Sequence, residues 1–272
     1  LVEMIPGPDC PTGGVIVAVS VSLAQPSAVP GAPPAEAVAP SWPILWRTED
    51  ALLKVKLTAA GLGYANRNAW YGQPNDFVGA NPLATKPSGS SWAPWVEGAF
   101  EIGLQGIAPV APSWYVYGSL SAIASASAGT ELFTDEPRSY GGIEDAYAGV
   151  VGGKTWDDGS RLVANFSGGR QTFQIADGML IRITAGNGFD RAALQLNPRW
   201  AADKLWLAEA RYNEHSVEVF RLDPDELPAI DSRTIVNGLN VETGIGSDRQ
   251  FGATLLYVPQ SSYGYYTPTA AG

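Results

Sequence analysis

The sequence has almost none of the residues on which catalytic and metal sites usually depend. Its 272 residues include one cysteine, Cys10, and one histidine, His215. A single cysteine excludes a disulfide framework within the chain and a cysteine-ligated metal centre. His215 stands beside Glu214 in a turn-like Asn-Glu-His-Ser stretch, which favours a solvated turn histidine over a catalytic base. We therefore expect no enzyme activity and no cofactor.

Charge is also scarce, at 16% of residues, and it is mainly acidic. Twenty-seven acids against 17 bases give a net charge of −10, which argues against nucleic acid or an anionic membrane surface as the main partner. The bases are unevenly distributed, because the stretch from Arg161 to Arg221 holds eight bases against six acids. This stretch is therefore +2, and the remainder of the chain is −12.

No apolar run is long enough to cross a bilayer as a helix. Residues 1–45 hold nine of the 21 prolines and no Lys or Arg. Within them, the apolar run Val15–Ala24 has the length of a signal-peptide core, and Ala37-Val-Ala39 matches a small-residue cleavage site. A signal-like leader is one interpretation, and a disordered Pro/Ala-rich leader or a misplaced start of the reading frame is the other. Residues 46–272 form the remaining domain.

From Lys54 onward the chain shows two-residue alternation of polar and apolar residues, the period of a β-strand. Arg161–Ser167 alternates, Gly168-Gly169 follows, and the rhythm resumes in Arg170–Ile175, so we predict a strand, a glycine turn and a second strand. Trp95–Gln105 and Leu205–Asn213 alternate in the same way. In all we expect about ten strands, with long loops at Gly61–Pro94 and Ser125–Arg138.

Many side chains on the apolar side of these strands are too small to fill a packed core. This side mixes large side chains with glycine and alanine, which suits contact with fluid lipid better than the close packing between two sheets. We therefore predict an all-β fold, an antiparallel transmembrane β-barrel built as a meander of hairpins. One face is expected to carry Glu97, Glu101, Arg161, Arg170, Glu209 and Arg211. The other is expected to carry Phe100, Ile102, Leu104, Phe166, Phe173 and Trp206.

Several landmarks occur in the order seen in one family of membrane proteins. They are Gly142-Ile-Glu-Asp-Ala-Tyr147, Gly168-Gly-Arg-Gln-Thr-Phe173 with Asp177-Gly178, Asn187-Gly-Phe-Asp-Arg191, and the strand from Leu205. Over about Gly142 to Val258 the chain resembles the alginate-export-type outer-membrane porins. The resemblance implies a bacterial outer-membrane barrel of 16–18 strands that passes anionic polysaccharide or small polar solutes, of which this chain is the amino-terminal part.

The resemblance and the strand pattern together suggest a charged lumen. The candidate residues along the solute path are Arg161, Arg170, Arg182, Arg191, Arg211, Glu97, Glu101 and Glu209. An equally open alternative is that the arginines are strand-end charges that pair with Asp177 and Asp190. The expected partners are the lipid bilayer of the outer membrane and the solute, without nucleic acid.

Two acidic pairs and one glycine pair admit other interpretations. Glu144-Asp145 and Asp157-Asp158 could bind Ca²⁺ or act as acid and base in a glycosidase, but acidic pairs near glycine usually form turns, and we expect no metal site. Gly186-Asn-Gly188 reads first as a hairpin turn. The main alternative to the porin is a secreted soluble β-sandwich, such as a carbohydrate-binding protein, and a glycosidase-type enzyme is the third possibility.

Overall fold

The computed structural model describes residues 17–21, 42–67, 92–129, 137–175, 178, 180–244 and 250–262. The expected cleavage site at Ala37–Ala39 lies outside them. The strands are β1 (Val17–Val21), β2 (Ile44–Arg47), β3 (Leu52–Asn66), β4 (Ala93–Ala111), β5 (Trp114–Gly129), β6 (Arg138–Thr155), β7 (Arg161–Arg170), β8 (Lys204–Tyr212), β9 (His215–Asp223), β10 (Ile235–Gly244) and β11 (Gln250–Gln260). Two 3₁₀ turns, η3 (Phe189–Arg191) and η4 (Pro228–Ile230), complete the described elements.

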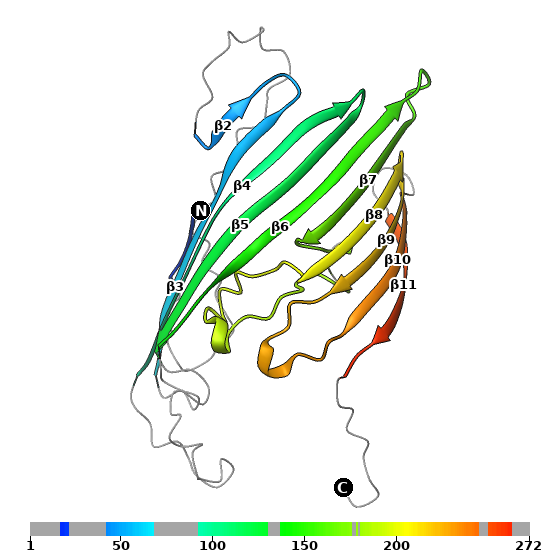
Figure 1. Ribbon diagram of the computed structural model, residues 1–272. Helices are drawn as coiled ribbons and strands as arrows, with labels where there is room; N and C mark the ends of the chain where they lie inside the picture. Colours follow the sequence, from blue (N-terminus) through cyan, green and yellow to red (C-terminus); the bar gives the residue numbers. More distant parts are fainter. Residues whose placement is uncertain are drawn as a thin grey trace, which may run out of the picture.

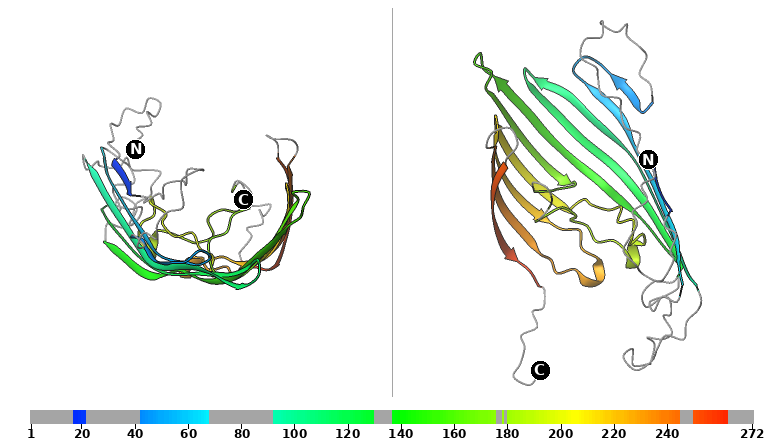
Figure 2. Two further views of the ribbon diagram at one scale, coloured as in Figure 1. Left: turned by 90° about the horizontal axis from the view of Figure 1, so that it is seen from above. Right: turned by 180° about the vertical axis from the view of Figure 1, so that it is seen from behind.

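All eleven strands belong to one antiparallel sheet. From β3 to β11 each strand pairs with the next along the chain, while β1 and β2 both pair with β3. The prediction of an all-β antiparallel meander is therefore confirmed. The sheet curves into an open arc (Figures 1 and 2), and its outer strands β1 and β11 do not pair with one another. The described residues form no second sheet, as a sandwich would require.

The two faces of the sheet separate by residue parity, as the alternation predicts. In β4, Glu97 is 2% exposed on the concave face, whereas Phe100 is 45% exposed on the convex face. The cross-strand register carries this division across the sheet, because Phe166 of β7 opposes Ala208 of β8. Large apolar side chains thus stand exposed on the convex face, including Val96, Phe100, Ile102, Leu104, Leu120, Ile143, Phe166 and Trp206.

The expected hairpin at Gly168-Gly169 is wrong. Both glycines lie within β7, and the chain leaves the sheet after Arg170 without forming a second strand. Gly169 has φ of 126°, and a Cβ there would stand 2.3 Å from the carbonyl oxygen of Ala146. Glycine is therefore required at this position for both its backbone conformation and its close approach to β6. It redirects the chain from the end of β7 into the arc.

The described residues of 171–203, which we call the inner segment, follow β7 in the chain and lie inside the arc (Figure 2). Their first residues pack a small apolar core against the concave face, formed by Phe173, Ile175, Ala202, Leu205, Phe220 and Leu222. The rings of Phe173 and Phe220 lie 4.6 Å apart between centroids. The expectation that Phe173 shares the apolar face of the sheet with Phe166 is therefore wrong. The chain has left the strand before this residue, so the alternation of faces along a strand no longer applies.

Candidate functional site

The concave face carries the buried polar groups of the protein. Its fully or nearly buried residues include Glu97, Glu101, Ser119, Ser121, Ser125, Glu144, Asp145, Ser167 and Asn240. Burying charge is costly unless it is paired and hydrogen-bonded. Each buried charge on this face therefore requires a partner.

A β-bulge places two consecutive carboxylates on the concave side of β6. Leu120 pairs with Ala146 and Ala122 pairs with Ile143, so Ser121 alone opposes Glu144 and Asp145. A bulge of this kind lets two residues of one strand face one residue of its neighbour. The expectation that Glu144-Asp145 forms a turn is therefore wrong. Asp157-Asp158, by contrast, lies in the turn between β6 and β7.

The bulge completes a cluster that joins four neighbouring strands, which we call the lysine cluster. Lys56 Nζ of β3 lies 2.5 Å from Glu101 Oε1 of β4 and 2.6 Å from Asp145 Oδ2 of β6. Two serines of β5 add hydrogen bonds. Ser121 Oγ donates to Glu101 Oε1 at 2.6 Å, and Ser119 Oγ donates to Asp145 Oδ2 at 3.0 Å. The lysine cluster thus ties β3 to β6 on the concave face.

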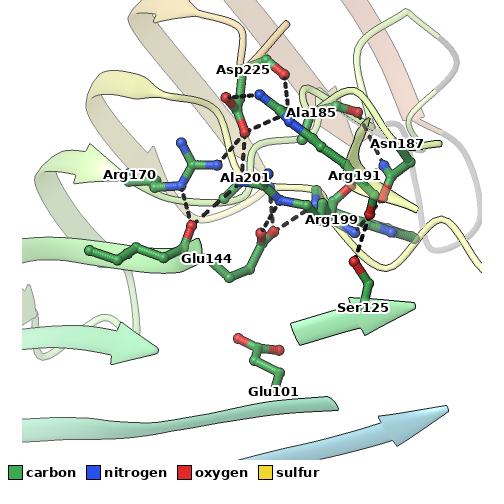
Figure 3. A network of polar contacts seen from close by, with 12 residues as sticks. Glu101, Ser125, Glu144, Arg170, Ala185, Asn187, Arg191, Arg199, Ala201 and Asp225 are labelled. Carbon is green, nitrogen blue, oxygen red and sulfur yellow. Dashed lines mark hydrogen bonds and ion pairs between the residues drawn. The ribbon is translucent and has the colours of Figure 1, made fainter. Parts of the chain in front are cut away.

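A second cluster, the arginine cluster, surrounds the carboxylate of Asp225 (Figure 3). Its three arginines are Arg170 at the end of β7 and Arg191 and Arg199 of the inner segment. Arg191 binds Asp225 with both Nη atoms, at 3.0 and 2.9 Å, and Arg199 Nη2 lies 2.7 Å from Asp225 Oδ2. Arg170 binds the same carboxylate and also Asp203. The cluster therefore ties the ends of β7 and β9 to the inner segment.

Carboxylates of the sheet hold the inner segment by its backbone. Glu97 accepts hydrogen bonds from the amides of Gln195 and Leu196, with the shortest at 2.7 Å. Glu144 Oε1 accepts the amides of Trp200 and Ala201 at 2.7 and 2.9 Å, and its Oε2 accepts from Arg199 Nε at 3.2 Å. These contacts satisfy amides that would otherwise be buried without partners. The inner segment is thus docked onto β4 and β6.

The predicted path residues fall into two groups. Glu97, Glu101, Arg170 and Arg191 belong to the buried contacts described above. Arg161, Arg182 and Arg211 are exposed, and Glu209 is half-buried; Arg211 Nη2 lies 3.3 Å from Glu209 Oε1, and Arg182 lies over the ring of Trp200. The first group is thus divided among the lysine cluster, the arginine cluster and the contacts that dock the inner segment, and the second group lies apart from all three.

Arg170 reaches the arginine cluster despite its position in the strand. The sequence pattern placed it on the polar parity, but it opposes Ala146 and so shares the parity of Phe166. Its guanidinium nevertheless turns to Asp225, and its Nε donates to the carbonyl oxygen of Ile143 at 2.8 Å. The strand ends at this residue, so its side chain is free to follow the chain into the arc.

The sequence pattern missed five members of the two clusters: Lys56 and Asp145 of the lysine cluster, and Arg199, Glu144 and Asp225 around the arginine cluster. The acidic pair in the middle of an otherwise alternating segment was the available signal for the bulge, because two adjacent polar residues break a strict alternation. Asp225 had no such signal. The expected hairpin at Gly186–Gly188 is also wrong, since this stretch leads into η3 and Ala185 forms a parallel bridge with Asp225.

His215 lies at the exposed start of β9, where its Nδ1 is 2.6 Å from Thr243 Oγ1. Within the described ranges, no three His, Cys, Asp or Glu side chains are grouped so as to hold a metal ion. None of the described helices is long and apolar enough to span a bilayer. Comparison with protein-family models and with curated proteins finds no match to this chain.

Asp225 should make the attachment of the inner segment sensitive to acid. Burial by itself would raise its pKa, but the hydrogen bond from Arg170 and the charges of the three arginines outweigh burial and lower the pKa below its usual value of 3.8. Because the folded pKa is the lower one, Asp225 stabilises the fold above the unfolded pKa and this stabilisation is lost as pH falls through the folded pKa.

We expect the stability difference between the parent protein and Asp225→Asn to stay constant near neutral pH and to shrink below about pH 4. Denaturant unfolding of the full chain in detergent, followed from pH 7 to 3, measures it. Asp157→Asn, in the exposed turn between β6 and β7, is the matched control and should stay close to the parent throughout. A difference for Asp225→Asn that persists undiminished at the lowest pH would contradict this role.

Proposed function

We propose that this protein is an outer-membrane β-barrel porin that passes polar solutes, including anionic polysaccharide, through a charged lumen. One observation carries the proposal: the sheet is inverted relative to a soluble protein, with charged residues buried on its concave face and large apolar residues exposed on its convex face. Soluble monomers rarely expose a contiguous apolar area of more than a few hundred Å². A lipid environment removes this cost, since the convex face would contact acyl chains.

The two edges of the sheet, at β1 and β11, are open in this structure. In hydrocarbon, unpaired backbone groups cost several kcal/mol each, so a sheet that spans a bilayer must close on itself. We propose that further strands complete the barrel beyond β1 and β11, to the 16–18 strands that the resemblance to alginate-export-type porins implies. The concave face would then line the lumen, and the inner segment would narrow it from one side.

The lengths of the connections suggest an orientation. Those that join β4 to β5, β6 to β7 and β8 to β9 have two to five residues and lie at one end of the sheet (Figure 1). At the other end, more than ten residues of sequence separate β3 from β4, β7 from β8 and β9 from β10. Transmembrane barrels have short periplasmic turns and longer extracellular loops. The inner segment and η4 would therefore lie toward the cell exterior.

The exposed arginines of the concave face are the candidates for charge selectivity. Arg161 and Arg211 lie near the end with short turns, because Val163, two residues after Arg161, opposes Arg211. A cation attracts an anion by about 1 kcal/mol at 4 Å in bulk water, and low-dielectric walls increase this. Arg170 and Arg191 are largely buried against Asp225, whereas Arg211 stays exposed beside Glu209 and Arg161 is exposed as well.

We expect the double variant Arg161→Gln/Arg211→Gln to lower the anion-to-cation permeability ratio roughly fivefold. Reversal potentials of the protein purified from cell envelopes, measured in planar bilayers across a salt gradient, give this ratio. Lys154→Gln is the control, since it removes one charge at the same end from a residue of the convex parity, opposite Leu162. A reversal potential that is unchanged in the double variant would show that these arginines are strand-end charges only. An absence of conductance in the parent would contradict the porin itself.

A further inference from the structure

One row of side chains across the convex face differs from its apolar surroundings. The register aligns Trp206 of β8 with Arg221 of β9, Arg221 with Asn237 of β10, and Asn237 with Tyr257 of β11. The next row toward the middle of the strands is wholly apolar. Its members are Phe166, Ala208, Val219, Leu239 and Leu255. Arg221 thus lies between Trp206 and Tyr257 in one row, and the neighbouring row consists of apolar side chains only.

Arg221 is the member of this row that calls for a partner. It is exposed, and its Nη1 donates to the neutral Asn237 Oδ1 at 3.1 Å. Within the described part of the chain, no carboxylate lies in ion-pair distance of it. The neighbouring aspartates at this edge already have cations as partners, because Lys204 lies 3.2 Å from Asp203 and 3.8 Å from Asp223, and Asp203 also contacts Arg170. Arg221 therefore presents uncompensated positive charge with an orientation fixed by Asn237.

The two rows together form a shallow groove of about 480 Å³. Ala208 is the small residue of the apolar row, and it leaves space between the exposed side chains of Phe166 and Val219. The rings of Phe166 and Trp206 stack with centroids 6.1 Å apart and form one wall. An acyl chain fits a groove with this lining, since it needs apolar contact and no hydrogen bonds.

We propose that this groove binds a phosphorylated glycolipid of the outer leaflet, with an acyl chain along the apolar row and a phosphate on Arg221. The proposal rests on the proposed function, in which the convex face contacts lipid and the carboxyl end of β9, near Arg221, lies toward the cell exterior. A guanidinium binds phosphate oxygens with two parallel hydrogen bonds, and tryptophan and tyrosine prefer the headgroup level of a membrane. Arginine costs little on a lipid-facing surface at that depth and much more at the midplane.

Titration of the full chain in detergent micelles, read by native mass spectrometry, tests the site. The probes are bis-phosphorylated lipid A and the same lipid after removal of its phosphates. We expect the parent to prefer the phosphorylated form, and Arg221→Gln to bind it about tenfold more weakly while its affinity for the dephosphorylated form is unchanged. Arg211→Gln removes the same charge from the concave face and should behave as the parent.

A second variant separates the groove from the charge. Ala208→Phe fills the groove and should weaken both lipid forms alike, with Arg221 intact. Equal binding of the two forms by the parent, or an unchanged preference in Arg221→Gln that retains its β-sheet circular dichroism, would overturn the phosphate site. Phosphatidylglycerol bound as tightly as lipid A would overturn its assignment to the glycolipid. Insertion of the protein purified from cell envelopes into phosphatidylcholine vesicles is measured in parallel, and a parent that fails to insert would instead overturn the proposed function.

Discussion

Replacing Arg199 by methionine is expected to destabilise the protein by about 3–5 kcal/mol, because it breaks a buried ion pair and leaves a carboxylate behind. Arg199 is 1% exposed. Its guanidinium contacts Glu144 and Asp225 and stacks over the ring of Tyr140, with 4.7 Å from Cζ to the ring centroid. Methionine keeps much of the length of the side chain and removes its charge and all of its hydrogen bonds.

Denaturant unfolding of the full chain in detergent gives the free-energy difference, and limited proteolysis within residues 171–203 reports release of the inner segment. Arg211→Met is the matched control. Its side chain is 61% exposed in the ion pair with Glu209, and such surface pairs contribute at most about 1 kcal/mol. The double variant Arg199→Met/Glu144→Leu should be less destabilised than the sum of the single changes, since it leaves no unpaired buried charge. A cost below about 1 kcal/mol for Arg199→Met would contradict the anchoring role.

The sheet could be predicted from the sequence because a strand has a short, local signature. Glu97, Glu101 and Phe100 reveal their faces by parity alone, and neighbouring strands separated by short turns pair in order. The same rule failed where the backbone leaves the regular strand. Phe173 lies beyond the end of β7 at Arg170, where the positive φ of Gly169 has turned the backbone out of the sheet. The alternation of the residues after it reflects their packing within the inner segment.

The site could be predicted only in part, because its geometry depends on contacts between distant residues. The density of arginine between Arg161 and Arg199 did indicate an unusual region. That Asp225 is the shared partner of three of these arginines depends on how the inner segment folds back into the arc, and no local pattern encodes this. The bulge at Glu144 and Asp145 could be predicted only in part. Its sequence signal, two adjacent acidic residues, is local, but the same signal also fits a turn.

The central claim is that the convex face contacts lipid, and an arginine on that face should reveal it. Ile102 lies in the middle of β4 and is 51% exposed on the convex face. In lipid, Ile102→Arg should cost about 2–4 kcal/mol, the penalty for arginine near the bilayer midplane on a lipid-facing strand. If the same face met water, replacing an exposed isoleucine would change stability by only about 0.5 kcal/mol.

The most direct measurement is the free energy of unfolding of Ile102→Arg in phospholipid vesicles, compared with Gln105→Arg. Gln105 lies on the same strand with the opposite parity, so its arginine would enter the polar concave side. We predict a loss of about 2–4 kcal/mol for Ile102→Arg and a loss of less than about 1 kcal/mol for Gln105→Arg. Equal and small effects for both variants, or a parent that remains a folded monomer in plain buffer and does not enter the vesicles, would contradict the claim.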